Sequence, residues 1–366
     1  MTLRLENVSK KVGPDTHIYP MDLELEPGGF NVLLGATLAG KTSLMRLMAG
    51  LDKPTTGRIL MAGQDVTDLP VQKRNVAMVY QQFINYPSLN VYDNIASPLK
   101  VLGLDKSKID RRVREAAELV HIEPFLQRLP GELSGGQQQR CAMARALVKE
   151  ADLLLFDEPL VNLDYKLREE LRYEMREIFR HSNTIAVYAS TEPAEALALG
   201  GNTAIMYQGR LVQFGPTVGV YHNPANVEVG KVFSDPPINL FPGRLDDRGL
   251  HIGRDIHVPL VGHLSQLQAG DYRIGVRANH LYVHQHSEQD VELDCQVDLA
   301  EIGGSETFIH ARHGEVEVTV QQEGAHEFHL GDPIRVYVDP RHLFIFDGTG
   351  ALVAAPERRK PQPTVV

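Results

Sequence analysis

The sequence lacks tryptophan, and it has only two cysteines, Cys141 and Cys295, among 366 residues. These cysteines lie far apart and fit neither a disulfide framework nor a metal-binding spacing. There is no excess of basic residues either, and the net charge of −10 argues against a general nucleic-acid-binding protein. No apolar run reaches the length of about 18 residues typical of a membrane span, and the N-terminus lacks the apolar core of a signal peptide. These absences predict a soluble, cytoplasmic chain.

What is present is ordinary globular composition, with 43% hydrophobic and 23% charged residues, in a chain long enough for two domains. Up to about residue 235, apolar strands alternate with helical patterns, as where residues 151–159 precede the amphipathic stretch 165–181. This alternation predicts a parallel sheet covered by helices. Residues 233–245 are rich in proline and turn residues and indicate a junction. Beyond the junction, short segments with alternating polarity favour a small all-β barrel or sandwich.

A glycine-rich stretch, GATLAGKT at 35–42, follows an apolar strand and fits the pattern G-x-x-x-x-G-K-[ST]. In such a loop, backbone N–H groups and the N-terminus of the next helix face phosphate oxygens. Lys41 is expected to reach the β- and γ-phosphates, and the Thr42 hydroxyl to ligate Mg²⁺. An ordinary glycine turn before a helix would explain neither the lysine nor its context. Leu38 would be awkward if its position requires a positive φ. The predicted ATP-binding residues are Gly35, Ala36, Thr37, Leu38, Ala39, Gly40, Lys41, Thr42 and Ser43.

A second element, LLLFDE at 153–158, is an apolar strand that ends in two acids. Ligands of α/β sheets bind at the carboxyl ends of the strands. Asp157 is suited to bind Mg²⁺, and Glu158 is suited to act as the base that orients the attacking water. A strand that merely ends in acidic residues before Pro159 is the alternative. The phosphate loop upstream favours the catalytic interpretation.

The third element is LSGGQ, formed by Leu133, Ser134, Gly135, Gly136 and Gln137. Ser134 can cap a helix, and the two glycines let backbone N–H groups approach an anion closely. This pentapeptide, about twenty residues before the acidic strand, resembles the signature motif of ABC ATPases. The resemblance implies that these five residues act on the ATP of a partner subunit.

Further stretches resemble other motifs of that family. Residues 78–95 resemble the Q-loop region, which implies that Gln81 senses Mg²⁺ and the attacking water, and 159–164 resemble the D-loop, with Asp164 as its aspartate. The C-terminal half resembles the regulatory OB-like domain of the maltose-type carbohydrate importers in three stretches, 239–245, 274–281 and 331–347.

The resemblance implies a fold class and a domain organisation. We expect an α/β P-loop NTPase domain of the ABC ATPase type over 1–235, with a helical subdomain at about 85–150. A small all-β OB-like (TOBE) regulatory domain is expected over 236–356, and a disordered tail over 357–366.

The resemblance also implies how such a chain works. Two ATPase subunits clamp two ATP molecules with Mg²⁺ head to tail, each between one subunit's phosphate loop and the other's signature motif. Closing and opening drive two membrane-spanning permease subunits, which the helical subdomain grips. A periplasmic or extracellular substrate-binding protein acts indirectly. The chain would be peripheral on the cytoplasmic side of the inner or plasma membrane.

Three positions depart from the family pattern. Val12 stands where the family has an aromatic residue that stacks on adenine, Val161 replaces a small polar residue of the D-loop, and Thr191 occupies the position of the H-loop histidine. A threonine hydroxyl is shorter than an imidazole and carries no positive charge. Loss of one such transition-state contact costs about 10²–10³ in rate. Valine forfeits about 1 kcal/mol of adenine stacking.

These departures lead to the hypothesis that the chain's own ATP site hydrolyses slowly. Its intact signature motif would then complete the competent site of a second, non-identical ATPase subunit. Tyr19 could instead cover the base in place of Val12, and another group could replace the histidine, although the adjacent Glu192 has the wrong charge for that role.

The overall pattern is similar to one ATPase subunit of glycerol importers that use two non-identical ATPases. Glycerol, sn-glycerol 3-phosphate and sugars remain open as cargo. Two alternatives are a homodimeric, fully active sugar-importer ATPase and an ABC-type regulatory ATPase that is not coupled to transport. The histidines at 280, 284 and 286 are expected to be solvated surface residues rather than a metal site.

Overall fold

The computed structural model describes the whole chain except residues 83, 162, 181, 254–255 and 358–366. The chain divides into two compact units, Met1–Thr217 and Val218–Val366. The domain boundary expected at 235/236 stays a prediction. The predicted disordered tail lies outside the described residues, apart from its first residue.

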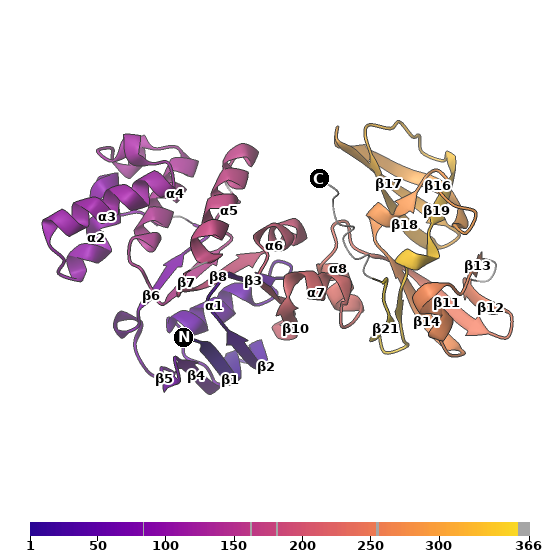
Figure 1. Cartoon of the computed structure of the whole chain (residues 1–366), viewed down its shortest axis with the longest axis horizontal. Helices are drawn as coiled ribbons and strands as arrows, with labels where there is room; N and C mark the ends of the chain where they lie inside the picture. The colour runs from indigo at the N-terminus through magenta and orange to yellow at the C-terminus, as the bar shows by residue number, and fades with distance from the viewer. Residues whose placement is uncertain (83, 162, 181, 254–255, 358–366) are drawn as a thin grey trace, which may run out of the picture. The chain divides into compact units, whose positions relative to one another are not determined.

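A six-stranded sheet forms the centre of the first unit (Figure 1). In spatial order its strands are β10 (Arg210–Pro216), β9 (Asn202–Tyr207), β3 (Phe30–Leu34), β8 (Ile185–Ser190), β7 (Leu153–Asp157) and β6 (Val76–Val79). All neighbouring strands are parallel except β10, which is antiparallel to β9. Every residue of β3, β7 and β8 is buried, as the near-continuous apolar runs require. The predicted parallel sheet is confirmed.

A second, antiparallel sheet in the same unit consists of β2 (Asp15–Leu25), β1 (Leu3–Val12), β4 (Thr56–Met61) and β5 (Gln64–Asp65). Helix α1 (Lys41–Ala49) joins one hydrophobic core with side chains from both sheets. Leu44 and Leu47 of this helix are fully buried there. The helix that follows the phosphate loop is therefore held rigidly from two sides.

The other face of the central sheet is covered by α5 (Tyr165–Arg180) and α6 (Pro193–Leu199). Helix α5 buries a single stripe of residues spaced by four, namely Leu167, Leu171, Met175 and Phe179. The Phe179 ring packs edge-on against Phe30 of β3 at 5.1 Å. The long amphipathic helix predicted after the acidic strand is confirmed.

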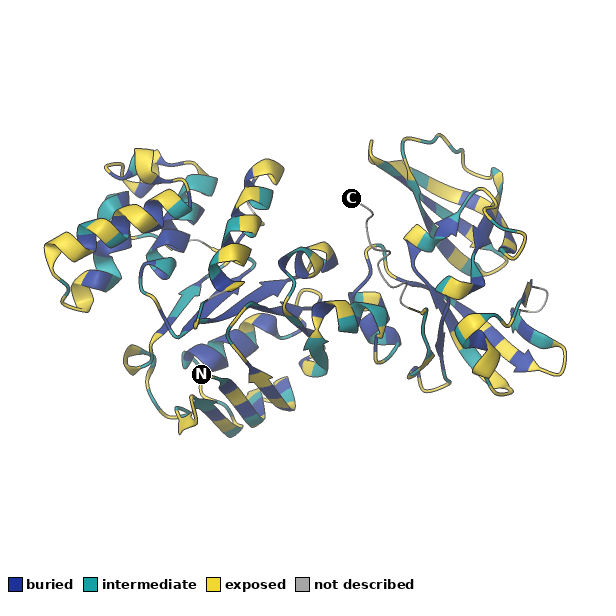
Figure 2. Ribbon diagram, in the orientation of Figure 1, coloured by how far each residue is buried: buried dark blue, intermediate teal, exposed yellow. Residues whose placement is uncertain are grey.

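Three helices occupy the segment between β6 and β7, and Figure 1 shows them grouped together. They are α2 (Val91–Val101), α3 (Lys106–Leu119) and α4 (Gly135–Leu147). Their outward faces are exposed, and their inward faces are buried (Figure 2). No helix among the described residues combines the length and the apolar character needed to cross a bilayer.

The second unit is built largely of antiparallel strands in two sheets. One sheet has the order β13 (Ile256–Val258), β12 (Gly249–Ile252), β11 (Asn239–Asp246), β14 (Gly270–Val276), β20 (Phe344–Phe346) and β21 (Leu352–Ala354). The other has the order β15 (Leu281–Tyr282), β19 (Pro333–Val338), β16 (Val291–Ile302), β17 (Glu306–His313) and β18 (Val316–Glu323). Both sheets contribute to the same hydrophobic core. The small all-β domain predicted from the alternating segments is confirmed.

The remaining short elements are helices α7 (Thr217–His222) and α8 (Val227–Val232) and the 3₁₀ turns Val71–Lys73, Glu123–Phe125, Pro130–Glu132, Gly262–Gln266, Ala278–His280 and Pro340–His342.

The junction predicted at 233–245 is wrong over its second half, which is strand β11. Buried and exposed residues alternate along this strand, and Pro242 faces outward. The Pro242 carbonyl still accepts a hydrogen bond from Gly253. A Cβ on Gly243 would lie 2.5 Å from the side chain of Ile274, so glycine lets the two strands pack closely. The proline and glycine that suggested a turn are therefore features of a strand.

Candidate nucleotide-binding site

The loop between β3 and α1 is shaped by close backbone approaches. A Cβ on Gly35 would lie 2.3 Å from the Met206 carbonyl oxygen. Gly40 ends the loop with φ 101°, and a Cβ there would lie 2.9 Å from Ile18. Only glycine fits both positions, so glycine is what allows the loop to make the narrow turn that leads into α1.

Leu38, in the middle of this loop, has φ 68° and is 96% exposed. The left-handed conformation costs a residue with a Cβ about 1–2 kcal/mol. The concern about this leucine is thus borne out: the loop shape requires a positive φ that leucine adopts only with strain.

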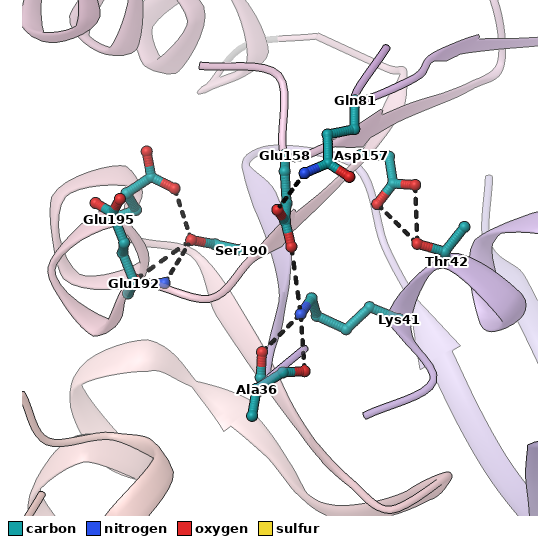
Figure 3. A network of polar contacts seen from close by, with 10 residues as sticks. Ala36, Lys41, Thr42, Gln81, Asp157, Glu158, Ser190, Glu192 and Glu195 are labelled. Atoms are coloured by element: carbon teal, nitrogen blue, oxygen red, sulfur yellow. Dashed lines mark hydrogen bonds and ion pairs between the residues drawn. The ribbon is translucent and has the colours of Figure 1, made fainter. Parts of the chain in front are cut away.

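Lys41, the first residue of α1, is almost fully buried, and its ammonium is held by three oxygens (Figure 3). Its Nζ donates to the carbonyl oxygens of Gly35 at 2.6 Å and Ala36 at 3.1 Å, and it lies 3.5 Å from Oε1 of Glu158. Burial lowers the pKa of Lys41, and the Glu158 carboxylate opposes that effect. The site therefore holds a desolvated cation at the phosphate loop.

Thr42 and Asp157 meet beside this lysine (Figure 3). The Thr42 hydroxyl donates to the two carboxylate oxygens of Asp157 at 2.9 and 3.1 Å. Burial raises the pKa of Asp157, and the hydrogen bond from Thr42 opposes the rise. A buried carboxylate beside a hydroxyl is an oxygen donor set that suits a hard divalent cation, so these residues fit Mg²⁺.

Glu158 connects the lysine with the segment after β6. Its Oε2 accepts a hydrogen bond from Gln81 Nε2 at 3.2 Å, and its backbone N–H donates to the Ala189 carbonyl at 3.2 Å. Glu158 has φ 49°, a strained conformation for a residue other than glycine. The structure therefore brings together the five residues that were predicted from the sequence to take part in catalysis or in Mg²⁺ binding: Lys41, Thr42, Gln81, Asp157 and Glu158.

A cavity of about 630 Å³ adjoins these residues, a volume in the usual range for small-molecule sites. Its wall includes residues 37–43, Gln81 and Glu158. The remaining lining residues come from β2 and the β9–β10 turn: Thr16, His17, Tyr19, Gln208 and Gly209. Within the described ranges, neither Val12 nor Thr191 lines this cavity.

The LSGGQ residues form the start of α4. Ser134 caps the helix: its hydroxyl accepts from Gln137 N–H at 3.3 Å, and its N–H donates to the Gln137 side chain at 3.0 Å. A Cβ on Gly136 would lie 3.1 Å from Leu163 in the predicted D-loop. The next residue, Asp164, caps α5 by accepting from Leu167 N–H at 3.0 Å. The signature and D-loop segments are therefore in contact, and neither lines the chain's own cavity in the part of the chain that the structure describes.

The turn after β8 contains a buried network that sequence analysis missed (Figure 3). The Ser190 hydroxyl donates to Glu195 Oε2 at 2.6 Å and accepts from Glu192 N–H at 2.9 Å, and Tyr188 donates to Glu195 Oε1 at 3.2 Å. Burial raises the pKa of Glu195. This network fixes the turn that carries the exposed Thr191. The Ser190 carbonyl also accepts from Gly35 N–H at 3.3 Å, which ties the turn to the phosphate loop. An acid in the first turn of a helix was the available signal.

The departing positions lie at the surface. Val12 ends β1 and is 49% exposed, and Val161 is 46% exposed. Tyr19, the alternative cover for the base, lines the cavity, and the Arg210 guanidinium lies 3.6 Å from the centre of its ring.

The expectation for the histidines in the second unit is wrong for one of the three. His284 and His286 are exposed, but the His280 ring stacks on His342 at 4.1 Å. Burial lowers the pKa of His280 to about 4. Among the described residues, no cluster of His, Cys, Asp or Glu is suited to hold a metal ion.

Comparison with known proteins gives two family matches and close full-length relatives. Residues 18–161 match the family described as ABC transporter, and residues 274–346 match the TOBE domain. The sn-glycerol-3-phosphate import ATP-binding protein UgpC of Pectobacterium atrosepticum is 35% identical over 353 residues, which are 96% of this chain and 98% of that protein. The protein of the same name from Escherichia coli is 36% identical over 349 residues, covering 94% of this chain and 98% of its own length.

Among solved structures, an ATP-binding cassette in a dimeric post-hydrolysis state with ADP and Pi is 25% identical to this chain. The match has a TM-score of 0.55 and covers 59% of this chain and 98% of that one.

Proposed function

This chain belongs to the ABC transporter family as an ATP-hydrolysing import subunit with a TOBE domain, and we propose that it energises an importer of a small polyol or its phosphate. The cargo class rests on the relatives, which are named for sn-glycerol 3-phosphate import. Cargo is recognised by membrane and binding-protein subunits, so this chain supplies the motor and not the selectivity.

Each residue of the site has a role that follows from its position. Lys41 would exchange its carbonyl partners for β- and γ-phosphate oxygens. Thr42 and Asp157, with Gln81, would hold Mg²⁺, which when bound neutralises phosphate charge. Glu158 would accept the proton of the attacking water, oriented by Gln81.

The chain's own site is proposed to be slow, and the observation that carries this proposal is Thr191. It follows directly on Ser190, whose carbonyl accepts a hydrogen bond from the first residue of the phosphate loop. Position 191 is thus next in sequence to a residue that contacts the phosphate loop, and threonine offers no cation there. The strained Leu38 adds a second irregularity to the same site.

The intact LSGGQ motif at the start of α4 supports a role of this chain in the ATP site of another subunit. The capped N-terminus of α4 is not among the described residues that line the chain's own cavity, and we propose that it acts on the ATP of another subunit. We infer a heterodimer with a non-identical ATPase whose own site is competent. This pair would act with two membrane-spanning permease subunits at the cytoplasmic face of the membrane.

The test is ATP turnover by the purified chain, alone and as Thr191→His. We expect slow turnover by the unmodified chain and an increase of about 10²–10³ in the variant, since one transition-state contact is restored. Thr191→Val is the matched control and should stay slow. Fast turnover by the unmodified chain would overturn the degenerate site and the need for a non-identical partner.

A further inference from the structure

The cavity beside the phosphate loop has a part that the phosphate-binding residues do not use. It is lined by Thr16, His17, Tyr19, Gln208 and Gly209. From these residues we infer that His17 and Tyr19 on β2 form the platform that receives the adenine base. This inference rests on the ATP binding of the proposed function.

The two side chains lie on the same face of the strand. They are two residues apart, and Ile18 between them is fully buried on the opposite face. His17 is exposed and Tyr19 half-buried, so both rings are accessible from the cavity that they line. One face of the strand therefore offers two aromatic rings to the cavity.

Backbone contacts place this face next to the phosphate loop. Tyr19 N–H donates to the Gly209 carbonyl at 2.9 Å, and Gly209 N–H donates to the Ala39 carbonyl at 3.0 Å. A Cβ on Gly209 would lie 2.5 Å from the His17 carbonyl oxygen. Strand β2, the β9–β10 turn and the loop are therefore joined by direct backbone contacts. A nucleotide whose phosphates lie on residues 37–43 has its base within reach of β2.

Arg210 fixes the orientation of the tyrosine. Its guanidinium stacks on the Tyr19 ring at 3.6 Å from the ring centre, an attractive cation–π contact. A ring held in this way need not be ordered when a base binds, so it loses little entropy. The imidazole of His17 and the amide of Gln208 can donate and accept hydrogen bonds at the edge of a heteroaromatic base.

Val12 is poorly placed for the same task. It ends β1, where its register partner is Asp15, and it is not among the described residues that line the cavity. Its branched aliphatic side chain has no π face for a base to stack on. The aromatic contact expected at position 12 has therefore moved to the neighbouring strand.

Calorimetric titration tests this assignment with two ligands, a non-hydrolysable imido analogue of ATP and inorganic tripolyphosphate, both with Mg²⁺. Tyr19→Leu should raise the Kd for the ATP analogue about tenfold, because stacking on the base is lost. The Kd for tripolyphosphate should not change, since that ligand has no base. Tyr19→Phe keeps the ring and should bind like the unmodified chain. Tyr173→Leu, an exposed tyrosine on α5, is the matched control.

The outcomes separate this inference from the proposed function. If neither ligand binds to the unmodified chain, ATP binding itself fails. If both ligands bind but Tyr19→Leu leaves the Kd of the analogue unchanged, or Val12→Ala raises it by as much, the platform is not on β2.

A second measurement needs no substitution. Photolabelling the unmodified chain with an azidopurine analogue of ATP should modify a peptide that contains His17 and Tyr19. Labelling confined to the peptide around Val12 would overturn the assignment, whatever the stability of the variants.

Discussion

The ammonium of Lys41 lies 3.5 Å from the Glu158 carboxylate while it donates to two loop carbonyls. Phosphate and carboxylate compete for the same cation, so a bound ATP must draw the lysine away before Glu158 can act as a base. We predict that Glu158→Gln lowers ATP turnover by about 10²–10⁴. The Kd for ATP should stay the same or fall, because the amide no longer competes for Lys41. Phosphate release and calorimetry measure the two effects, and turnover within tenfold of the unmodified chain would contradict the role.

Ser190→Ala should destabilise the protein through the turn after β8. The substitution removes a 2.6 Å donor from the buried Glu195 and the acceptor of Glu192 N–H. A buried polar group without its partner costs about 1–3 kcal/mol, so the free energy of unfolding should fall by that amount. Urea unfolding followed by circular dichroism checks it. Ser107→Ala, at an exposed position of α3, is the control and should stay within about 0.5 kcal/mol of the unmodified chain.

Stability should also depend on pH through His280. In the folded chain its pKa is about 4, lowered first by burial and then by His342 and Arg277, with Asp339 opposing and His222 adding to the effect. An unfolded histidine titrates near pH 6.5, so between about pH 6.5 and 4 the unfolded chain binds a proton that the folded chain does not. The contribution of His280 to the free energy of unfolding is therefore complete above about pH 6.5, and it is lost as the pH falls. We expect a loss of about 2–3 kcal/mol across this window.

The variant His280→Phe keeps a ring against His342 but cannot titrate. Unfolding at pH 7.5 and 5.0 should show a smaller difference for this variant than for the unmodified chain. His284→Phe, at an exposed position, should keep the full difference. If His280→Phe is as sensitive to pH as the unmodified chain, other groups are responsible.

The catalytic set was predictable because each member follows the carboxyl end of a parallel strand. Lys41 comes after β3, Gln81 after β6, Asp157 ends β7, and Glu158 follows it. In a parallel sheet these ends share one edge, so motifs far apart in sequence must converge. The buried strands are near-continuous apolar runs, which makes them visible without any alignment.

The contacts that were not predicted depend on how separate segments pack against each other, and no sequence pattern marks that packing. Glu195 lies in the first turn of α6, but its partners Ser190 and Tyr188 become visible only when α6 folds back on β8. The Arg210–Tyr19 stack joins β10 to β2 in the same way. Pro242 suggested a junction because proline is rare in strands, and only the neighbouring strands show why it is tolerated in β11.

Arg168 on α5 connects two of the departing positions, and its removal should loosen both. Its guanidinium donates to the Val161 carbonyl at 3.4 Å and lies 3.5 Å from Glu192, the residue after Thr191. The Glu192 side chain is 46% exposed, so the pair adds less than about 1 kcal/mol to global stability. Local opening is more sensitive than global unfolding, because it depends on the contacts of these two segments and not on the whole core. We therefore predict that Arg168→Gln leaves the urea midpoint nearly unchanged. Amide hydrogen exchange should nevertheless accelerate about threefold around Val161 and around Glu192.

Arg180→Gln, an exposed arginine on the same helix, should change neither segment. Faster exchange in only one of the two segments would mean that Arg168 does not couple them, and the D-loop and the turn after β8 would then respond to nucleotide independently.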